Sequence, residues 1–337
     1  MKLPTAGGRR ADCRRCVLIE CVTANGPKRT SGGGAALAAL LLLCFLLALG
    51  AMRSDLFPDS SANSVPPMER ESLPFALLAI AATLVTVARG AKWPRGRQLW
   101  AAVVIGLGLF VAPAVLVYIS HQWVSAFTRV ALFSLTPVFA VVFEPYIGGG
   151  TGSQSRTDLM AALASVLGTL CVFPINLPIS IQAGAAFAAV IVAAACVAAA
   201  NCKAVRAASE SPGIDLVPMA AIAGATAATG LVAVSAATEG LTSRLIASDV
   251  VWSASVTLPS LCLLFWLMRR MTAARMTTRF VLAPLIAILI GIAIDRPSIE
   301  PRTSLGLILI AGAVGWLLFA PAKKPDANSS TLKLNGD

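Results

Sequence analysis

The chain has 337 residues, of which 57% are hydrophobic and only 13% are charged, and its formal net charge is +11. Because an average soluble domain carries about 25% charged residues, this composition excludes an ordinary soluble globular protein and favours a chain embedded in a membrane. The positive charge does not indicate a nucleic-acid-binding protein, since the basic residues lie in loops and tails and not in stripes with interleaved aromatic residues.

Ten apolar runs follow one another along the chain, each about as long as the roughly 20 residues that a helix needs to cross a bilayer. Every backbone polar group must be paired within lipid, so the runs are predicted to be α-helices and the fold class is all-α integral membrane. The flanking tails, residues 1–34 and 322–337, are expected to be disordered. The predicted spans, 1 to 10 in order, are 35–52, 73–89, 99–119, 123–147, 157–175, 181–201, 216–238, 250–268, 277–295 and 303–321.

The positions of Lys and Arg orient these spans. With both termini in the cytosol, the connections on the cytosolic side hold most of the basic residues, as the positive-inside rule requires. We therefore expect an integral protein of the plasma (inner) membrane with cytosolic N- and C-termini. The basic residues then predicted on the outer side are Arg53, Arg70, Arg244, Arg296 and Arg302.

Prolines interrupt two spans in each half of the chain. Pro113 and Pro137 lie in spans 3 and 4, and Pro259 and Pro284 lie in spans 8 and 9 at nearly the same separation. The match predicts two copies of a five-helix unit, and because five is odd the second copy is inverted in the membrane. Each proline frees a carbonyl one turn earlier, which a solute or a polar side chain can use. The alternative is a proline that only bends a helix for packing.

A resemblance supports a division into residues 35–175 and 176–321. The segment APLIAILIGIAIDRPSIEPRTSLGLILIAGAVGWLLF resembles the end of an EamA-type repeat of the drug/metabolite transporter superfamily, and LTPVFAVVFEPYIGGG followed by DLMAALASVLGTLCVF resembles the same part of a first repeat. The resemblance implies ten helices, two inverted five-helix halves, cytosolic termini and no shared set of catalytic residues. The chain departs from the family after span 4, where Gly148–Gly149–Gly150 replaces an acidic residue, whereas Asp295 fills the corresponding place after span 9.

One side of span 4 carries polar residues. At about 100° per residue, Ser125, Arg129 and Thr136 fall on one face of the helix, and Glu144 lies near that face. A charge at mid-bilayer costs about 2.5 to 3.5 kcal/mol on insertion scales and usually faces a cavity or a partner. Arg129 is therefore interpreted either as a clamp for an anionic group of a substrate or as a side chain that reaches the outer head groups. Glu144 is interpreted either as a proton-coupling carboxylate, if burial favours its protonated form, or as an interfacial acid.

Further candidate substrate-binding residues lie near the outer ends of spans 3 and 8. Tyr118 stands near His121, the only histidine, for which pH sensing and an ordinary loop position are the alternatives. Trp252 and Ser255 are placed either to bind a solute or to serve helix packing. Arg279, at the start of span 9, is interpreted as a cytosolic positive charge.

No catalytic residue, metal site or cofactor is predicted, because the sequence contains no phosphate-binding loop, no serine-hydrolase motif and no pair of histidines. Five cysteines in or beside the apolar runs are interpreted as small buried hydrophobic residues. Cys13, Cys16 and Cys21 of the N-terminal tail lack the second pair of ligands that a zinc site needs, so a metal or redox role is only the alternative for them, and no disulfide is expected in a cytosolic tail.

The predicted function is that of a secondary transporter, an exporter or exchanger of small organic metabolites that works by alternating access. Its expected partners are a small-molecule solute, a coupling proton if Glu144 titrates, and the lipid bilayer, with no nucleic acid, and the chain is expected to be a monomer or a homodimer. The alternative is a non-transporting membrane scaffold or sensor, which the long basic N-terminal tail with its cysteines favours.

Overall fold

The computed structural model describes residues 34–53, 65–147, 156–173, 175, 178–210, 216–241, 247–295 and 300–319. Within these ranges every regular element is helical, and nine helical segments are long and apolar enough to cross a membrane. The chain therefore has the all-α architecture and the apolar character of an integral membrane protein. The predicted tails, apart from Gly34, lie outside the described residues, so their expected disorder stays a prediction.

Helices occupy all ten predicted spans. Span 5 is α9, which has 17 residues and is shorter than the nine segments counted above. Span 6 continues past its predicted end to Glu210, because its alanines and basic residues favour a helix beyond the apolar run. In chain order the elements are α2 (Gly34–Ala51), α4 (Pro67–Ala88), α5 (Arg97–Gly106) with η1 (Leu107–Val111) and α6 (Ala112–Ser120), α7 (Ala126–Phe133) with α8 (Thr136–Ile147), α9 (Arg156–Val172), α10 (Ile181–Glu210), α11 (Leu216–Thr238), α12 (Ala247–Trp252) with η2 (Ser253–Thr257) and α13 (Leu258–Met268), α14 (Ala273–Thr277) with α15 (Arg279–Asp295), and α16 (Pro301–Phe319).

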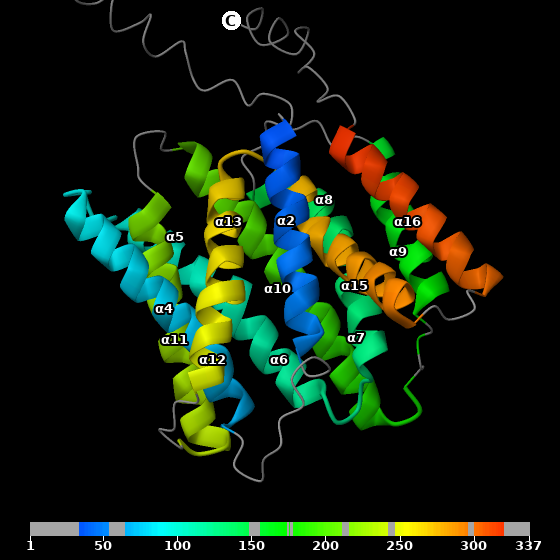
Figure 1. Ribbon diagram of the computed structural model, residues 1–337, viewed down its shortest axis with the longest axis horizontal. Coiled ribbons are helices and arrows are strands. Elements are labelled where there is room, and N and C mark those ends of the chain that lie inside the picture. Colours follow the sequence, from blue (N-terminus) through cyan, green and yellow to red (C-terminus); the bar gives the residue numbers. More distant parts are fainter. Residues whose placement is uncertain are drawn as a thin grey trace, which may run out of the picture.

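The first helix begins and the last helix finishes at the same end of the bundle (Figure 1). We call it the Gly34 end, and we call the opposite end, where α2 finishes, the Arg53 end. Two helix pairs form the flanks, α4 with α11 on one side and α9 with α16 on the other (Figure 1). Between them, α10 packs against α6 and α8, and α2 packs against α13 and α15.

Small residues let the central helices approach closely. Ala193, Ala194 and Ala198 in α10 are each 0% exposed. A Cβ atom added at Gly106 in α5 would lie only 2.6 Å from the carbonyl oxygen of Ala223 in α11. Because apolar side chains gain little by moving from lipid tails into a helix interface, such close van der Waals contact is a main source of helix association in a membrane.

Spans 3 and 8 are interrupted in the same way. In each, five residues of π-helix precede a new α-helix that has proline at its second position. The residue before each proline donates its backbone N–H five residues back, from Ala112 to the carbonyl of Leu107 and from Leu258 to that of Ser253. Since proline has no N–H, the wider turn re-pairs backbone groups that an unbroken α-helix would leave without partners.

Spans 4 and 9 each consist of two helices with a break between them. Ser125 caps α7 by accepting a hydrogen bond from the Thr128 N–H (3.2 Å), and Thr272 caps α14 by accepting one from the Arg275 N–H (3.4 Å). The second helix of each span, α8 or α15, starts directly after the break. The two spans therefore share the type of cap and an internal break, although α7 has eight residues before its break and α14 has five.

Three of the four prolines predicted as helix breaks follow an interruption. Pro113, Pro137 and Pro259 each stand at the second position of a new helical segment. Pro284 instead lies inside α15, and the break of span 9 falls earlier, at Thr278. The Thr278 hydroxyl donates to the carbonyl oxygen of Arg275 (2.6 Å) and so pairs one of the terminal carbonyls of α14.

The close contact between α9 and α16 depends on two glycines, Gly168 and Gly306. A Cβ atom added at Gly306 would lie 2.7 Å from the carbonyl oxygen of Gly168, whereas nothing lies within 4 Å of one added at Gly312 in the same helix. Gly306→Ala should lower the free energy of unfolding by about 1–3 kcal/mol through overpacking. Gly312→Ala is the control and should not lower it. Thermal unfolding of the purified protein in detergent measures both, and equal melting temperatures would contradict the glycine contact.

Candidate functional site

Phe133 and Phe280 stack where two interrupted spans meet. Their ring centroids are 5.9 Å apart and the ring planes are inclined by 26°. Phe133 ends α7 and Phe280 lies in the first turn of α15, and each lies one helical turn before the proline of its span, Pro137 or Pro284. Helix α8 packs on α14 and α7 packs on α15, and both rings are partly buried. The stack therefore joins corresponding positions of spans 4 and 9.

An almost completely buried arginine lies beside this stack. Arg279 is 4% exposed, and its guanidinium lies over the ring of Phe280, 4.6 Å from the centroid. Nη1 and Nη2 both donate to Oδ1 of Asn201 in α10 (3.3 Å each), and Nη1 also donates to the carbonyl oxygen of Met276 (3.2 Å). Both partners are uncharged. The thiol of Cys44 in α2 is an ionisable group that interacts electrostatically with Arg279. Its guanidinium therefore has hydrogen-bond partners but no carboxylate partner in the described part of the chain.

Arg279, interpreted above as a cytosolic positive charge, is buried in the bundle, and the side of the membrane on which it lies stays a prediction. Span 9 begins with the short helix α14, which places a further turn before Arg279 and carries this residue into the bundle. The burial of Arg279 could not be predicted from the sequence, because Arg269, Arg270 and Arg275 lie nearby and a basic cluster beside an apolar run is typical of a cytosolic loop. Asn201 could have indicated a buried polar partner such as Arg279, since a polar amide at the end of an apolar run needs a hydrogen-bond partner inside the bundle.

Arg129 lies one helical turn before Phe133, on the same face of α7. Its side chain is half-buried, and its guanidinium takes no part in the hydrogen bonds and ion pairs found within the described ranges. Arg129 in α7 and Arg279 in α15 therefore both lie close to the stacked rings. The clamp and the head-group interpretations of Arg129 both stay predictions.

Three predicted solute-binding hydroxyl groups are bonded to their own helices. Thr136 is 0% exposed and donates to the carbonyl oxygen of Phe133 (2.6 Å) at the break of span 4. Ser255 is exposed and donates to the carbonyl oxygen of Val251 (2.7 Å). Ser125 caps α7. Thr136 and Ser255 give their protons to the backbone, so each keeps only acceptor capacity for a solute.

An open pocket of about 450 Å³ lies at the Arg53 end, between the α6–α7 connection and the start of α10. Ser125 and His121 line it, together with the apolar ring of Phe187. Tyr118 stacks on His121 with ring centroids 5.4 Å apart. The predicted residues Tyr118 and Ser125 therefore meet at this pocket, Ser125 directly and Tyr118 through His121.

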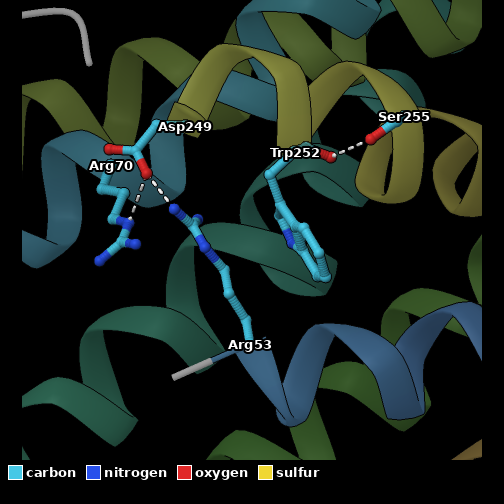
Figure 2. Close-up of polar contacts among 5 residues, drawn as sticks. All are labelled: Arg53, Arg70, Asp249, Trp252 and Ser255. Atoms are coloured by element: carbon cyan, nitrogen blue, oxygen red, sulfur yellow. Dashed lines mark hydrogen bonds and ion pairs between the residues drawn. The ribbon is translucent and has the colours of Figure 1, made fainter. Parts of the chain in front are cut away.

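A buried carboxylate joins three helices at the Arg53 end. Figure 2 shows Asp249, in α12, between the guanidinium groups of Arg53, just after α2, and Arg70, in α4. Asp249 is 5% exposed, and its Oδ1 lies 3.1 Å from Nε of Arg70 and also pairs with Nη2 of Arg53. The Arg53 guanidinium lies over the ring of Trp252, 5.7 Å from its centroid (Figure 2).

Asp249 was not predicted as a functional residue, because it precedes predicted span 8. Helix α12 starts earlier than that span, so the carboxylate lies inside the helical segment. The distribution of arginines could have identified Asp249. Arg53 and Arg70 were both predicted on the same membrane face as Asp249, where an acidic partner stabilises them. Trp252 contacts Arg53, and its role as a solute ligand stays a prediction.

Glu144 lies in the last turns of α8 near the Gly34 end and is half-buried. It acts electrostatically on the thiol of Cys202 in α10, whose Sγ donates to the carbonyl oxygen of Ala140 one turn earlier in α8 (3.6 Å). Arg206 also links α10 to this region by donating to the carbonyl oxygen of Ile147 (3.1 Å). Glu144 therefore lies close to α10, and its proton-coupling role stays a prediction.

The five described cysteines differ in exposure. Cys44 and Cys202 are buried as predicted, Cys171 and Cys196 are intermediate, and Cys262 is exposed because its side of α13 is left uncovered by neighbouring helices. No group of His, Cys, Asp and Glu side chains that could hold a metal ion is found in the described ranges. The three cysteines of the N-terminal tail lie outside those ranges.

Comparison with known proteins supports the fold. No family model and no curated protein matches the chain. A solved structure described only as "Crystal structure of protein" is similar, with a TM-score of 0.67 and 16% sequence identity, and the match covers 86% of this chain and 99% of that one. At this identity the likeness concerns the fold alone, so the function has to be argued from the residues of this chain.

The ion pairs of Asp249 generate a stability prediction. Removing one partner of a buried pair costs about 3–5 kcal/mol. Because the side chains of Arg53 and Arg70 are 17% and 27% exposed, we expect a smaller loss for Asp249→Asn, about 1–3 kcal/mol. Thermal unfolding in detergent measures it, with Glu300→Gln, an exposed acid before α16, as the control. A loss for Asp249→Asn no larger than that for Glu300→Gln would rule out a stabilising role of these pairs.

Proposed function

We propose that the chain is a secondary transporter, an exporter or exchanger of small organic metabolites that works by alternating access, and that it belongs to the EamA-type proteins of the drug/metabolite transporter superfamily. The observation that carries the proposal is the stack of Phe133 on Phe280, which joins corresponding positions of two interrupted spans. In transporters built from inverted repeats, the solute site lies where such broken helices of the two repeats meet.

The first five spans and the last five share their features in the same order, which supports an inverted repeat. The π-helical turn before Pro113 recurs before Pro259, and the cap at Ser125 recurs at Thr272. Helix contacts recur as well, because α2 packs on α13 and α15 while α10 packs on α6 and α8. Corresponding helices also pair directly, α4 with α11 and α9 with α16, which is consistent with a two-fold axis between the members of each pair.

Alternating access requires contacts between the halves that form at one end and break when that end opens. At the Arg53 end, Asp249 of the second half is paired with Arg53 and Arg70 of the first half. Glu239, also of the second half, accepts a hydrogen bond from the backbone N–H of Met68 in the first half (3.4 Å). The positive-inside rule assigns this end to the outer face. In our proposal these contacts close the outer face and break when the halves rock.

A non-transporting scaffold or sensor is the second candidate. The feature that favours it is the basic N-terminal tail with Cys13, Cys16 and Cys21, which lies outside the described residues. A scaffold needs no movement of one half against the other. Restriction of that movement therefore separates the two candidates.

Solute release from liposomes tests the proposal. Liposomes that contain the purified protein and a defined mixture of sugars, amines and organic acids should release at least one of these classes faster than protein-free liposomes. A bismaleimide cross-linker with a reducible spacer, attached to Arg53→Cys and Asp249→Cys, joins the halves and should nearly abolish the release until the spacer is reduced. The same cross-linker attached to Arg53→Cys and Arg70→Cys stays within the first half and should leave most of the release intact.

Wild-type protein treated with the same cross-linker controls for its native cysteines. Release of no solute class, or release that the cross-link between the halves leaves unchanged, would contradict transport by alternating access and favour the scaffold.

A further inference from the structure

Arg279 carries a charge inside the bundle that no carboxylate within the described ranges neutralises. Its side chain is 4% exposed, and its bonds go to an amide oxygen and a backbone oxygen. An arginine that only tied α10 to α15 would not need this charge, because a neutral side chain can bridge two helices without the cost of burying an ion. Buried ionisable residues in membrane proteins pair with one another or with backbone carbonyls, and such a residue is by default a candidate functional site.

The present partner of Arg279 fits it poorly. Both distances from the guanidinium to Oδ1 of Asn201 are 3.3 Å, whereas charge-assisted N–H···O bonds are about 2.7–2.9 Å long. One amide oxygen is shared by two nitrogens that could each bond a separate oxygen. A carboxylate offers two oxygens at the spacing of the guanidinium fork and a full negative charge.

The surroundings add positive charge and apolar surface. Arg279 is the first residue of α15, so the positive end of that helix lies at the same point. On the first half, Arg129 lies one turn from Phe133, and no acidic side chain within the described ranges is bonded to either arginine. The stacked rings of Phe133 and Phe280 lie beside the guanidinium of Arg279.

We infer that this site binds an organic carboxylate, whose two oxygens replace Oδ1 of Asn201 on the guanidinium of Arg279 while its apolar body contacts Phe133 and Phe280. The inference rests on the proposed transport function, because the buried site is reached only when the halves rock. Arg129 supplies a second cation that attracts the anion towards the stack from the Arg53 end.

Benzoate and benzamide are matched probes, because they share a ring and only benzoate is charged. Isothermal titration calorimetry on the purified full chain in detergent should detect binding of benzoate but not of benzamide. Arg279→Gln should weaken benzoate binding at least about tenfold. Arg275→Gln is the control, because Arg275 also links helices, through the carbonyl oxygen of Leu317 (3.2 Å), and its loss should leave benzoate binding unchanged.

Arg279→Lys decides the question if Arg279→Gln does not fold. Lysine keeps the charge and lacks the fork, so this variant should bind benzoate more weakly than the wild type and still prefer it to benzamide. Absence of benzoate binding to the wild type, equal binding of the two probes, or wild-type benzoate affinity in Arg279→Gln would overturn the inference. Binding of inorganic phosphate without binding of benzoate would also overturn it, since the ligand would then be a phosphate.

The liposome assay separates failure of this inference from failure of the proposed function. If sugars or amines are released and organic acids are not, the transporter proposal is supported and the inference of a carboxylate ligand is wrong. If benzoate binds in a manner that depends on Arg279 but no solute class is released, the anion site stands and the transporter proposal fails.

Discussion

Backbone pairing in lipid is the constraint on which the rest of this structure depends. A proline inside a membrane helix removes a donor, and no water is present to pair the carbonyl that is left. The chain meets this constraint with π-helical turns before Pro113 and Pro259 and with a break between two helices before Pro137, whereas Pro284 lies inside α15. In our proposal the interruptions of spans 3, 4, 8 and 9 let one half move against the other.

The sequence predicted the helices well because each is an apolar run of membrane length. Boundaries were harder to predict, since hydropathy reports only the part of a helix that is apolar. Helix α10 continues through Lys203 and Arg206 to Glu210, because these residues are compatible with a helix although they are not apolar. Pro284 shows a second limit of predicting helix boundaries from the sequence. The residues around it do not indicate whether the first helix of span 9 ends at this proline or earlier, at Thr278.

The candidate site was predictable only in part. Arg129 stood out because it is a single charge within an apolar run, and it does lie close to the aromatic stack. Arg279 and Asp249 were missed because each stands at the edge of its run, where a charge ordinarily reaches water. Their burial depends on how far each helix extends and how it is rotated toward its neighbours. That information resides in contacts such as Arg279 with Asn201, between residues far apart in the chain.

The two buried charges also differ in what they have found as partners. Asp249 is paired with two arginines across the boundary between the halves, so its charge is used within the protein. Arg279 has only neutral hydrogen-bond partners in the described part of the chain, and in our inference a bound carboxylate supplies the opposite charge. The ion pairs of Asp249 suit a contact that closes an end of the bundle, whereas the neutral surroundings of Arg279 suit a site that binds an anion.

In our proposal the two halves rock about the Phe133–Phe280 stack, so that the two ends of the bundle open alternately. Distances between spin labels in liposomes test this most directly, with one exposed pair, Trp123 and Leu241, at the Arg53 end and another, Lys92 and Arg269, at the Gly34 end. Asp249→Asn should increase the population of the longer distance at the Arg53 end and decrease it at the Gly34 end. A single distance at each end, unchanged by Asp249→Asn, would contradict the account.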